Sequence, residues 1–339
     1  MVGDHLYAAC CAGRLYAFDP DNGKILWKYD VSADSAWGFH GQPLIIDSII
    51  YIGTDQSQRG RHGDLHAIDR FTGKLLWKLP ADPGLPSDLC VKDSLIFMIS
   101  YGGEVLAVNR FAGDFVWRIK GERRSDTAAG DTSSTKFARA TVAPVAWNDY
   151  IYVSASDTAV ICLQAATGTV IWSKKLDAPM SSRFVLLDSM LIFGTDAGDI
   201  QYIRCRDGAE IRRDSLAVRP FLAMAYVDSV LIFMGDTGNE KPRDLIALNP
   251  YTGTTVWQNS LDDPDSNACW NVPRVHVWGD YVLLGTNTGW VAAFSVADGS
   301  LIWSRQLQGS IRSIGHSPGM LYVGTMAGRL YAIKADFTP

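Results

Sequence analysis

Short apolar stretches and turn-forming residues alternate along the whole chain. Tyr51–Gly53 and Leu321–Gly324 are examples of the apolar stretches, and their length and composition indicate buried β-strands. A second apolar stretch precedes each of them and ends in residues that tolerate a tight reversal. These turns are Asp47-Ser48, Asp93-Ser94, Asn148-Asp149, Asp188-Ser189, Asp228-Ser229, Gly279-Asp280 and Pro318-Gly319. The alternation predicts antiparallel meanders of four short strands.

One spaced pattern repeats on this background: glycine, three residues, alanine, five residues, glycine, three residues, tryptophan. The first copies are Gly13, Ala17, Gly23 and Trp27; Gly63, Ala67, Gly73 and Trp77; and Gly103, Ala107, Gly113 and Trp117. Later copies keep the spacing with substitutions, at Cys162, Gly168 and Trp172; Gly198, Tyr202, Gly208 and Arg212; Ala247, Gly253 and Trp257; and Gly289, Ala293, Gly299 and Trp303. An eighth copy begins at Gly328 and Ala332.

The repeat predicts an all-β protein. Four short strands every roughly 40 to 55 residues, with glycine and aromatic residues at fixed offsets, are typical of propeller blades. We therefore expect a single eight-bladed β-propeller domain over residues 1–339, built from four-stranded antiparallel blades, with the first and last blades incomplete. The expected blades are approximately 1–30, 42–79, 86–120, 141–176, 183–216, 220–261, 272–307 and 311–339.

Six of the repeated tryptophans have a predicted structural role. We expect each ring to fill a slot that a small residue leaves in a strand of the neighbouring blade, which buries about 200 Å² per ring. These docking residues are Trp27, Trp77, Trp117, Trp172, Trp257 and Trp303. The glycine before each of them is expected in a five-residue hairpin that requires a positive φ.

The segment Leu15-Tyr16-Ala17-Phe18-Asp19, followed by Gly23-Lys24 and Trp27, resembles the tryptophan-docking repeat of quinoprotein dehydrogenases that use pyrroloquinoline quinone (PQQ). It is similar, in the same way, to the repeat of the BamB outer-membrane assembly lipoproteins. The resemblance covers essentially the whole chain and implies the propeller fold. It leaves the function open, because one fold hosts unrelated activities.

Composition and charge narrow the possible functions. Charged residues make up 20% of the chain and the net charge is -5, so nucleic acid is not an expected partner. The apolar run Leu44–Ile52 is interrupted by Asp47-Ser48, and no run reaches the roughly 20 residues of a transmembrane helix. No secretion signal is recognisable at the first residues, whereas the resemblance implies a periplasmic or envelope location. We expect a monomer.

Long connections are predicted at one end of the blades only. The turns between strands one and two and between strands three and four keep a nearly constant length. The insertions fall at the other end, at Ser32–Gly41, Asp55–His62, Gly121–Ala140, Gly235–Arg243 and Asp262–Asn271. Because binding residues concentrate on variable loops held by a rigid scaffold, this end is the expected binding surface.

Cations and aromatic residues gather in these loops and at the starts of the innermost strands. The predicted residues for binding a partner or an anion are Arg59, Arg61, His62, Trp37, Arg139, Arg183, Arg219, Trp270, Arg274 and Arg312. One interpretation is that these cations pair with Asp88, Asp126, Asp131, Asp263 and Asp265. The other is a site for a carboxylate, a phosphate or an acidic peptide. The aromatic residues Trp37, Phe39, Tyr101, Phe137 and Trp270 fit either a binding hot spot or a packed core.

The resemblance to quinoprotein dehydrogenases implies a calcium site, a catalytic aspartate and often a disulfide between adjacent cysteines. Cys10 and Cys11 are adjacent, but Cys10 aligns with Thr54 and Thr195 of the repeat, so the quinone site does not carry over. No catalytic residue is assigned and no cofactor is expected, with PQQ and calcium as the alternative. Zinc or copper at Cys10, Cys11, His40 and His62 is a further alternative. Cys162 and Cys205 are expected in the core.

These observations favour a non-catalytic scaffold for protein interaction. By resemblance to BamB it would bind a protein or peptide partner during outer-membrane protein assembly. The inter-blade segment Asp177–Arg183 loosely resembles the partner-binding loop of that family. Two alternatives stay open: a PQQ-dependent oxidoreductase, and a propeller that binds a small ligand or a carbohydrate as a sensor.

Overall fold

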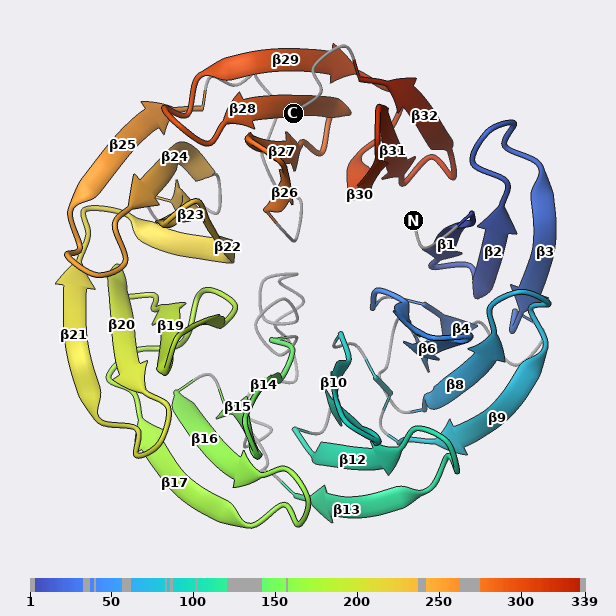
Figure 1. Cartoon of the computed structure of the whole chain (residues 1–339), viewed down its shortest axis with the longest axis horizontal. Helices are drawn as coiled ribbons and strands as arrows, with labels where there is room; N and C mark the ends of the chain where they lie inside the picture. Colours follow the sequence, from blue (N-terminus) through green and yellow to red (C-terminus); the bar gives the residue numbers. More distant parts are fainter. Residues whose placement is uncertain are drawn as a thin grey trace, which may run out of the picture. The chain divides into compact units, whose positions relative to one another are not determined.

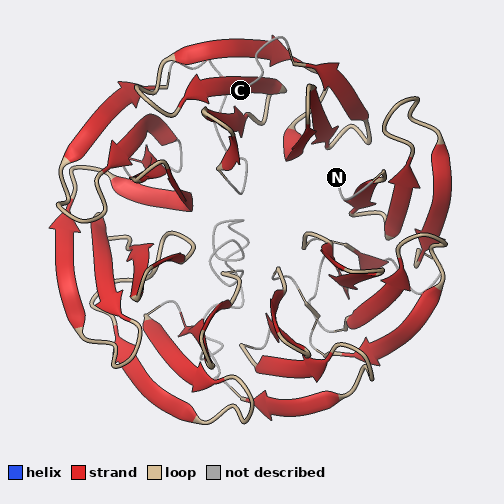
Figure 2. Ribbon diagram, in the orientation of Figure 1, coloured by secondary structure: helices blue, strands red, loops and turns tan. Residues whose placement is uncertain are grey.

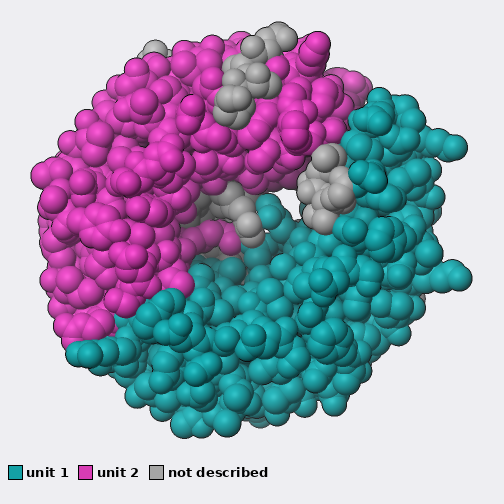
Figure 3. Space-filling view, viewed as in Figure 1, with its two compact units in different colours: residues 1–179, 205–208 teal, residues 180–204, 209–339 magenta. Residues whose placement is uncertain are grey.

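The computed structural model describes residues 4–32, 37–39, 41–56, 62–82, 84–85, 88–100, 103–120, 142–156, 158–236, 242–261 and 275–335. These residues form β-strands and connecting loops, and no helix occurs among them (Figure 2). None of the described segments is a helix long and apolar enough to cross a membrane. The chain divides into two compact units, residues 1–179 with 205–208, and residues 180–204 with 209–339 (Figure 3).

Most of the strands are labelled in Figure 1, and each successive antiparallel sheet is called a blade. Blade 1 consists of β1 (Leu6–Cys10), β2 (Arg14–Phe18) and β3 (Ile25–Asp30). Blade 2 consists of β5 (Leu44–Ile46), β6 (Ile49–Gly53), β8 (Asp64–Asp69) and β9 (Leu75–Pro80), and the short strands β4 (Trp37–Gly38) and β7 (Asp55–Gln56) pair beside it. Blade 3 consists of β10 (Cys90–Lys92), β11 (Leu95–Ile99), β12 (Val105–Asn109) and β13 (Phe115–Ile119). Blade 4 consists of β14 (Val145–Trp147), β15 (Tyr150–Ser156), β16 (Ala159–Gln164) and β17 (Val170–Lys175).

The remaining blades follow the same order. Blade 5 consists of β18 (Val185–Leu187), β19 (Met190–Gly194), β20 (Asp199–Arg204) and β21 (Glu210–Ser215). Blade 6 consists of β22 (Arg219–Val227), β23 (Val230–Asp236), β24 (Pro242–Leu248) and β25 (Thr255–Ser260). Blade 7 consists of β26 (His276–Trp278), β27 (Tyr281–Gly285), β28 (Trp290–Ser295) and β29 (Leu301–Gln306), and blade 8 of β30 (Ile311–Ser317), β31 (Met320–Thr325) and β32 (Leu330–Lys334).

The predicted fold class, an all-β eight-bladed β-propeller, is confirmed. Blades 2 to 7 have four strands each, and among the described residues blades 1 and 8 have three, as the sequence predicted for the first and last blades. The two central strands of a four-stranded blade are apolar and buried, for example β6 and β8, whereas the fourth strand β9 alternates between exposed and half-buried residues. The buried apolar side chains thus lie between neighbouring blades.

The predicted tight turns join the first two strands of blades 2 to 8. Ile46 pairs with Ile49 and Lys92 with Leu95, which leaves two residues in each loop. Asp47 and Asp93 have φ values of 54° and 52°, in the left-handed region that two-residue hairpins need. Aspartate tolerates this region better than most residues, which explains why it recurs at this position.

Each docking tryptophan of the first blades contacts the hairpin of the next blade. Trp27 donates a hydrogen bond from Nε1 to the carbonyl oxygen of Arg70 at 2.9 Å, and a Cβ placed on Gly73 would lie 2.6 Å from the Trp27 ring. The same bond joins Trp117 to Ala165, Trp172 to Cys205 and Trp257 to Val296. Trp77 lies over Gly113 in the same way, and Trp303 packs against the apolar core of blades 7 and 8.

The slot for the tryptophan ring differs from the one expected from the sequence. The small residue in the third strand, such as Ala17, lies opposite the tryptophan of its own blade, Trp27. The ring instead occupies the space over the hairpin glycine of the next blade, where φ is +68° at Gly73. This glycine therefore serves two purposes, since it allows the left-handed turn and leaves room for the indole.

Candidate functional site

The two ends of each blade differ in their connections. At one end, here called the constant end, the hairpins between strands three and four close with the same backbone bond. The glycine N–H donates to the carbonyl oxygen four residues earlier, at 2.8 to 2.9 Å, in blades 1, 2, 3, 4, 6 and 7. The opposite end, here called the variable end, carries the corners between strands two and three. The backbone bond that closes the corner joins Thr195 to Asp199, four residues later, in blade 5. In blade 2 it joins Thr54 to Asp64, ten residues later.

Arg219 begins β22 at the variable end and bridges two blades of unit 2. Its guanidinium lies 3.2 Å from Oδ1 of Asp196, in the corner of blade 5, and also donates to Oδ2 of Asp236, at the end of β23. The Arg219 side chain is 13% exposed and Asp236 is completely buried. Neither aspartate belongs to the set that the sequence offered as partners. Arg219 thus joins blade 5 to blade 6 rather than presenting an open cation.

Arg312 has a different environment from Arg219. It is the second residue of β30, and the register of β30 against β31 shifts between Ile311 and Ser313. Such a bulge turns a side chain away from its expected direction, and the Arg312 side chain is exposed. Among the described residues it forms no hydrogen bond or ion pair. Arg183, just before β18, is half-buried, and its carbonyl oxygen accepts a hydrogen bond from Ser182 Oγ at 3.0 Å.

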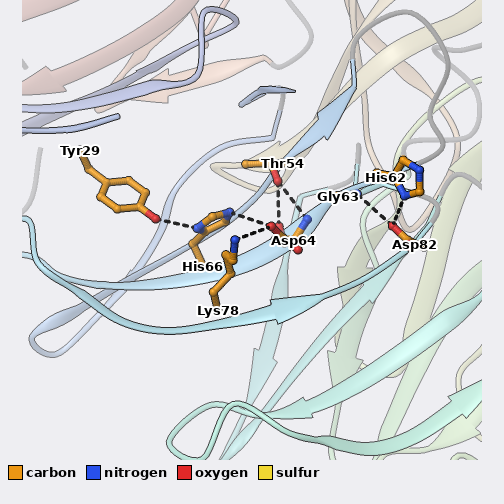
Figure 4. Close-up of polar contacts among 8 residues, drawn as sticks. All are labelled: Tyr29, Thr54, His62, Gly63, Asp64, His66, Lys78 and Asp82. Carbon is orange, nitrogen blue, oxygen red and sulfur yellow. Dashed lines mark hydrogen bonds and ion pairs between the residues drawn. The ribbon is translucent and has the colours of Figure 1, made fainter. Parts of the chain in front are cut away.

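The structure places three other residues from the sequence analysis. His62 is exposed, with Nδ1 3.1 Å from Asp82 Oδ1 (Figure 4). Asp88 accepts the backbone N–H of Gln42 at 2.8 Å, so it serves the link between blades 2 and 3. Phe39 is 3% exposed and packs in the core of blades 1 and 2, as the core interpretation of this aromatic residue expected.

The other predicted site residues lie outside the described residues. They are Arg59, Arg61, Arg139, Trp270 and Arg274, together with Tyr101, Phe137, Asp126, Asp131, Asp263 and Asp265. The backbone of Trp37 is described in β4, but its side chain is not. Their roles therefore stay predictions.

A buried polar cluster that the sequence analysis did not identify lies in unit 1 (Figure 4). Tyr29 of β3 is 2.9 Å from Nδ1 of His66 in β8, a side chain that is only 1% exposed. Nε2 of His66 lies 3.9 Å from Oδ2 of Asp64, and the same oxygen is 3.4 Å from Nζ of Lys78. The corner residue Thr54 accepts the backbone N–H of Asp64 at 2.9 Å. The cluster connects blades 1 and 2.

Burial sets the protonation of this cluster. The pKa of His66 is lowered to about 3, mainly because the buried imidazolium would lose its hydration and secondly because the ammonium of Lys78 is nearby. The carboxylate of Asp64 would favour the imidazolium, but it is already paired with Lys78. His66 is therefore neutral at physiological pH.

A cross-strand acid–base pair recurs at the same place in other blades. An acidic residue stands at the start of the third strand or directly before it, and a basic residue follows the tryptophan or its equivalent in the fourth strand. The pairs are Asp64 with Lys78 at 3.4 Å, Glu104 with Arg118 at 2.7 Å and Asp199 with Arg213 at 3.6 Å. The acidic and basic residues stand at equivalent positions of the aligned repeats. This recurrence in the sequence could have identified Asp64 and Lys78 as a pair.

The described residues do not bring together the ligands of a metal site such as the dehydrogenase alternative requires. Within the described ranges, no three histidine, cysteine or acidic side chains come together to hold a metal ion. Cys10 ends β1 opposite Arg14, and neither it nor the exposed Cys11 forms a disulfide with another described residue. His40, which the alternative zinc or copper site needed, is not among the described residues.

Residues 11–145 and 122–336 match the family described as outer membrane protein assembly factor BamB. The chain belongs to this family. The resemblance to PQQ-type repeats of the BamB style is thereby confirmed.

Individual relatives fall into two groups. BamB from Moranella endobia is 22% identical over 246 residues, which cover 70% of this chain and 58% of the relative. The dehydrogenase subunit of the quinone alcohol dehydrogenase from Gluconacetobacter polyoxogenes is 25% identical over 274 residues, 70% of this chain and 34% of the relative. The crystal structure of BamB from Moraxella catarrhalis superposes with a TM-score of 0.75 at 18% identity, over 98% of this chain and 95% of that one. At this identity the superposition supports the propeller fold alone.

The chain spans only part of several curated relatives. It covers 13% of a quinohemoprotein alcohol dehydrogenase from Pseudomonas putida, 58% of the Moranella endobia BamB and 49% of BamB from Yersinia pestis. Both groups of relatives share the repeat, and membership of the family leaves the activity of this chain to be argued from its own residues.

Proposed function

We propose that this chain is a non-catalytic scaffold that binds a protein partner at its variable end, in the assembly of outer-membrane proteins. The observation that carries the proposal is the contrast between the two ends of the blades: hairpins that close with the same backbone bond in six blades at the constant end, and corners of different length at the variable end. A rigid sheet scaffold that varies only in one set of loops is the usual arrangement for recognition. Family membership supports the same role.

Arg312 is an exposed cation on the proposed binding surface. It is exposed on a bulge of the innermost strand of blade 8, and it is not neutralised by a described acidic residue. A guanidinium in this position suits a carboxylate of an acidic segment in the partner, which it can bind through two parallel hydrogen bonds. The other predicted cations of the loops would extend this surface.

Binding of the purified chain to the purified outer-membrane insertase of the same organism tests this role. We expect a saturable complex, and Arg312→Glu should weaken it about tenfold or more, because an attractive charge contact becomes repulsive. Arg305→Glu is the matched control, since Arg305 is an exposed cation on the outer strand β29 of the neighbouring blade and should change the affinity less than about twofold. Absence of a complex, or equal weakening by both variants, would contradict the proposal.

The oxidoreductase alternative rests on the quinone alcohol dehydrogenases among the relatives. It is tested by adding PQQ and calcium to the purified chain and measuring dye-linked oxidation of primary alcohols. Because no ligand set for calcium forms among the described residues, we expect no turnover above that of the cofactor alone. Saturable, calcium-dependent turnover by the chain would replace the scaffold proposal with the enzymatic one.

A further inference from the structure

The contact between blades 5 and 6 lacks the tryptophan found in the neighbouring blades. Arg212 stands at the tryptophan position of β21, and its guanidinium carbon lies 3.9 Å above the ring of Tyr202. Its nitrogens donate to the carbonyl oxygens of Pro250, at 2.9 Å, and of Tyr251, in the hairpin of blade 6. Asp214 pairs with the same guanidinium, with Nε 2.9 Å from Oδ1.

Asp214 also fills the space that an indole fills elsewhere. A Cβ placed on Gly253 would lie 2.6 Å from the Asp214 carboxylate, just as a Cβ on Gly299 would lie 2.5 Å from the Trp257 ring. The Arg212–Asp214 pair therefore replaces a tryptophan side chain at this seam. At the variable end, the Asp196–Arg219–Asp236 group makes a second ionic link between the same two blades. We call these five residues the ionic joint.

The seam between blades 6 and 7 provides an internal comparison. There Trp257 donates to the carbonyl oxygen of Val296 at 2.9 Å, and Asn259 donates to that of Asp298 at 2.6 Å. Among the described residues, the apolar cluster across each of the two seams contains ten buried residues. The two seams thus differ mainly in whether the dock is ionic or aromatic.

We propose that blades 5 and 6 separate before blades 6 and 7 do, because the ionic joint holds them less strongly than a docked tryptophan would. The free-energy cost of removing two charges from water offsets most of the attraction between them in a buried ion pair. When the seam opens, both charged groups are hydrated again. A buried indole has no such compensation and loses its contacts outright. The blade 5–blade 6 seam then opens at a lower free energy than the blade 6–blade 7 seam.

Hydrogen exchange of the intact chain, followed by mass spectrometry at low denaturant concentration, tests the proposal. Local opening exposes the amides of the strands at a seam, so exchange rates report its free energy. We expect the amides of β22 to exchange about tenfold faster than those of β26 and β27. Equal rates at the two seams would overturn the proposal.

A double variant transplants the aromatic dock. Arg212→Trp with Asp214→Asn copies Trp257 and Asn259 of blade 6, and it should slow exchange in β21 and β22 about tenfold while leaving β26 and β27 unchanged. A folded double variant with unchanged exchange in β22 would contradict the proposal. If circular dichroism shows that it does not fold, Arg212→Lys serves instead, because lysine keeps the charge but loses the planar fork. It should accelerate exchange at blades 5 and 6 only, and acceleration throughout unit 2 would count against an isolated joint.

Discussion

Gly73→Ala is expected to lower the free energy of unfolding by about 3 kcal/mol, whereas Gly23→Ala should cost only about 1 kcal/mol. Both glycines have nearly the same backbone conformation, with φ of +68° and +71°, so an added Cβ strains both equally. At Gly73 the Cβ would also lie 2.6 Å from the Trp27 ring, while at Gly23 nothing lies within 4 Å. The difference between the two variants therefore isolates the docking of the tryptophan.

Urea denaturation followed by tryptophan fluorescence and by circular dichroism measures both variants. Gly113→Ala, under the Trp77 ring at 2.5 Å, should behave like Gly73→Ala. An equal decrease in the free energy of unfolding for Gly23→Ala and Gly73→Ala would contradict this prediction. It would mean that backbone strain alone destabilises both variants and that the Trp27 indole moves aside at no cost in stability.

Acid should destabilise the protein through His66. Burial holds the pKa of His66 at about 3, below the 6.5 of the unfolded chain, so the unfolded state binds a proton that the folded state cannot. This contribution to stability is complete above pH 6.5 and is lost progressively as the pH falls from 6.5 to 3. Between pH 7.5 and pH 4.5 the loss from this one residue is about 2 to 3 kcal/mol.

The variant His66→Leu removes this titration. Leucine occupies the equivalent position in blade 3, at Leu106, so the side chain suits the repeat. Denaturation at pH 7.5 and at pH 4.5 measures how much the free energy of unfolding falls between these two pH values. This decrease should be smaller for His66→Leu than for the wild type, by about 2 kcal/mol or more. His62→Gln is the matched control, because His62 is 57% exposed, and its loss should equal that of the wild type. An unchanged pH dependence in His66→Leu would contradict the assignment of the acid sensitivity to this cluster.

Most of the fold could be predicted from the sequence because it depends on local, repeated chemistry. The aspartates at two-residue turns and the hairpin glycines impose backbone conformations that few other residues accept, so each fixes a strand boundary. The incomplete first and last blades followed from counting the same signals. The place where the indole docks did not follow, because the spacing shows which residues are small but not which blade they face.

The candidate site could be predicted only in part. Arg219 and Arg312 were grouped by sequence as cations at the start of inner strands, yet the structure gives them opposite environments. Asp196 and Asp236 come from corners of different blades, and only their spatial approach identifies them as partners of Arg219. A one-residue bulge exposes Arg312, and no residue type in the sequence signals it. The cluster around His66 could not be predicted, because its partners, Tyr29 and Asp64, lie on two blades.

The exposed aromatic residues at the constant end offer a rival to the proposed binding surface. Phe111 is 61% exposed, and the guanidinium of Arg110 lies 4.3 Å from the centre of its ring. An aromatic residue beside an arginine is a composition that binding hot spots share. The two ends of the blades must therefore be compared directly.

Site-specific photo-crosslinking in living cells makes this comparison. A photoreactive amino acid is placed at position 312, at the variable end, or at position 111, at the constant end, in otherwise identical chains. Binding of a protein partner at the variable end predicts a discrete crosslinked adduct from position 312, identifiable by mass spectrometry, and none from position 111. Adducts from position 111 in the absence of any from position 312 would contradict the central proposal and move the docking surface to the constant end.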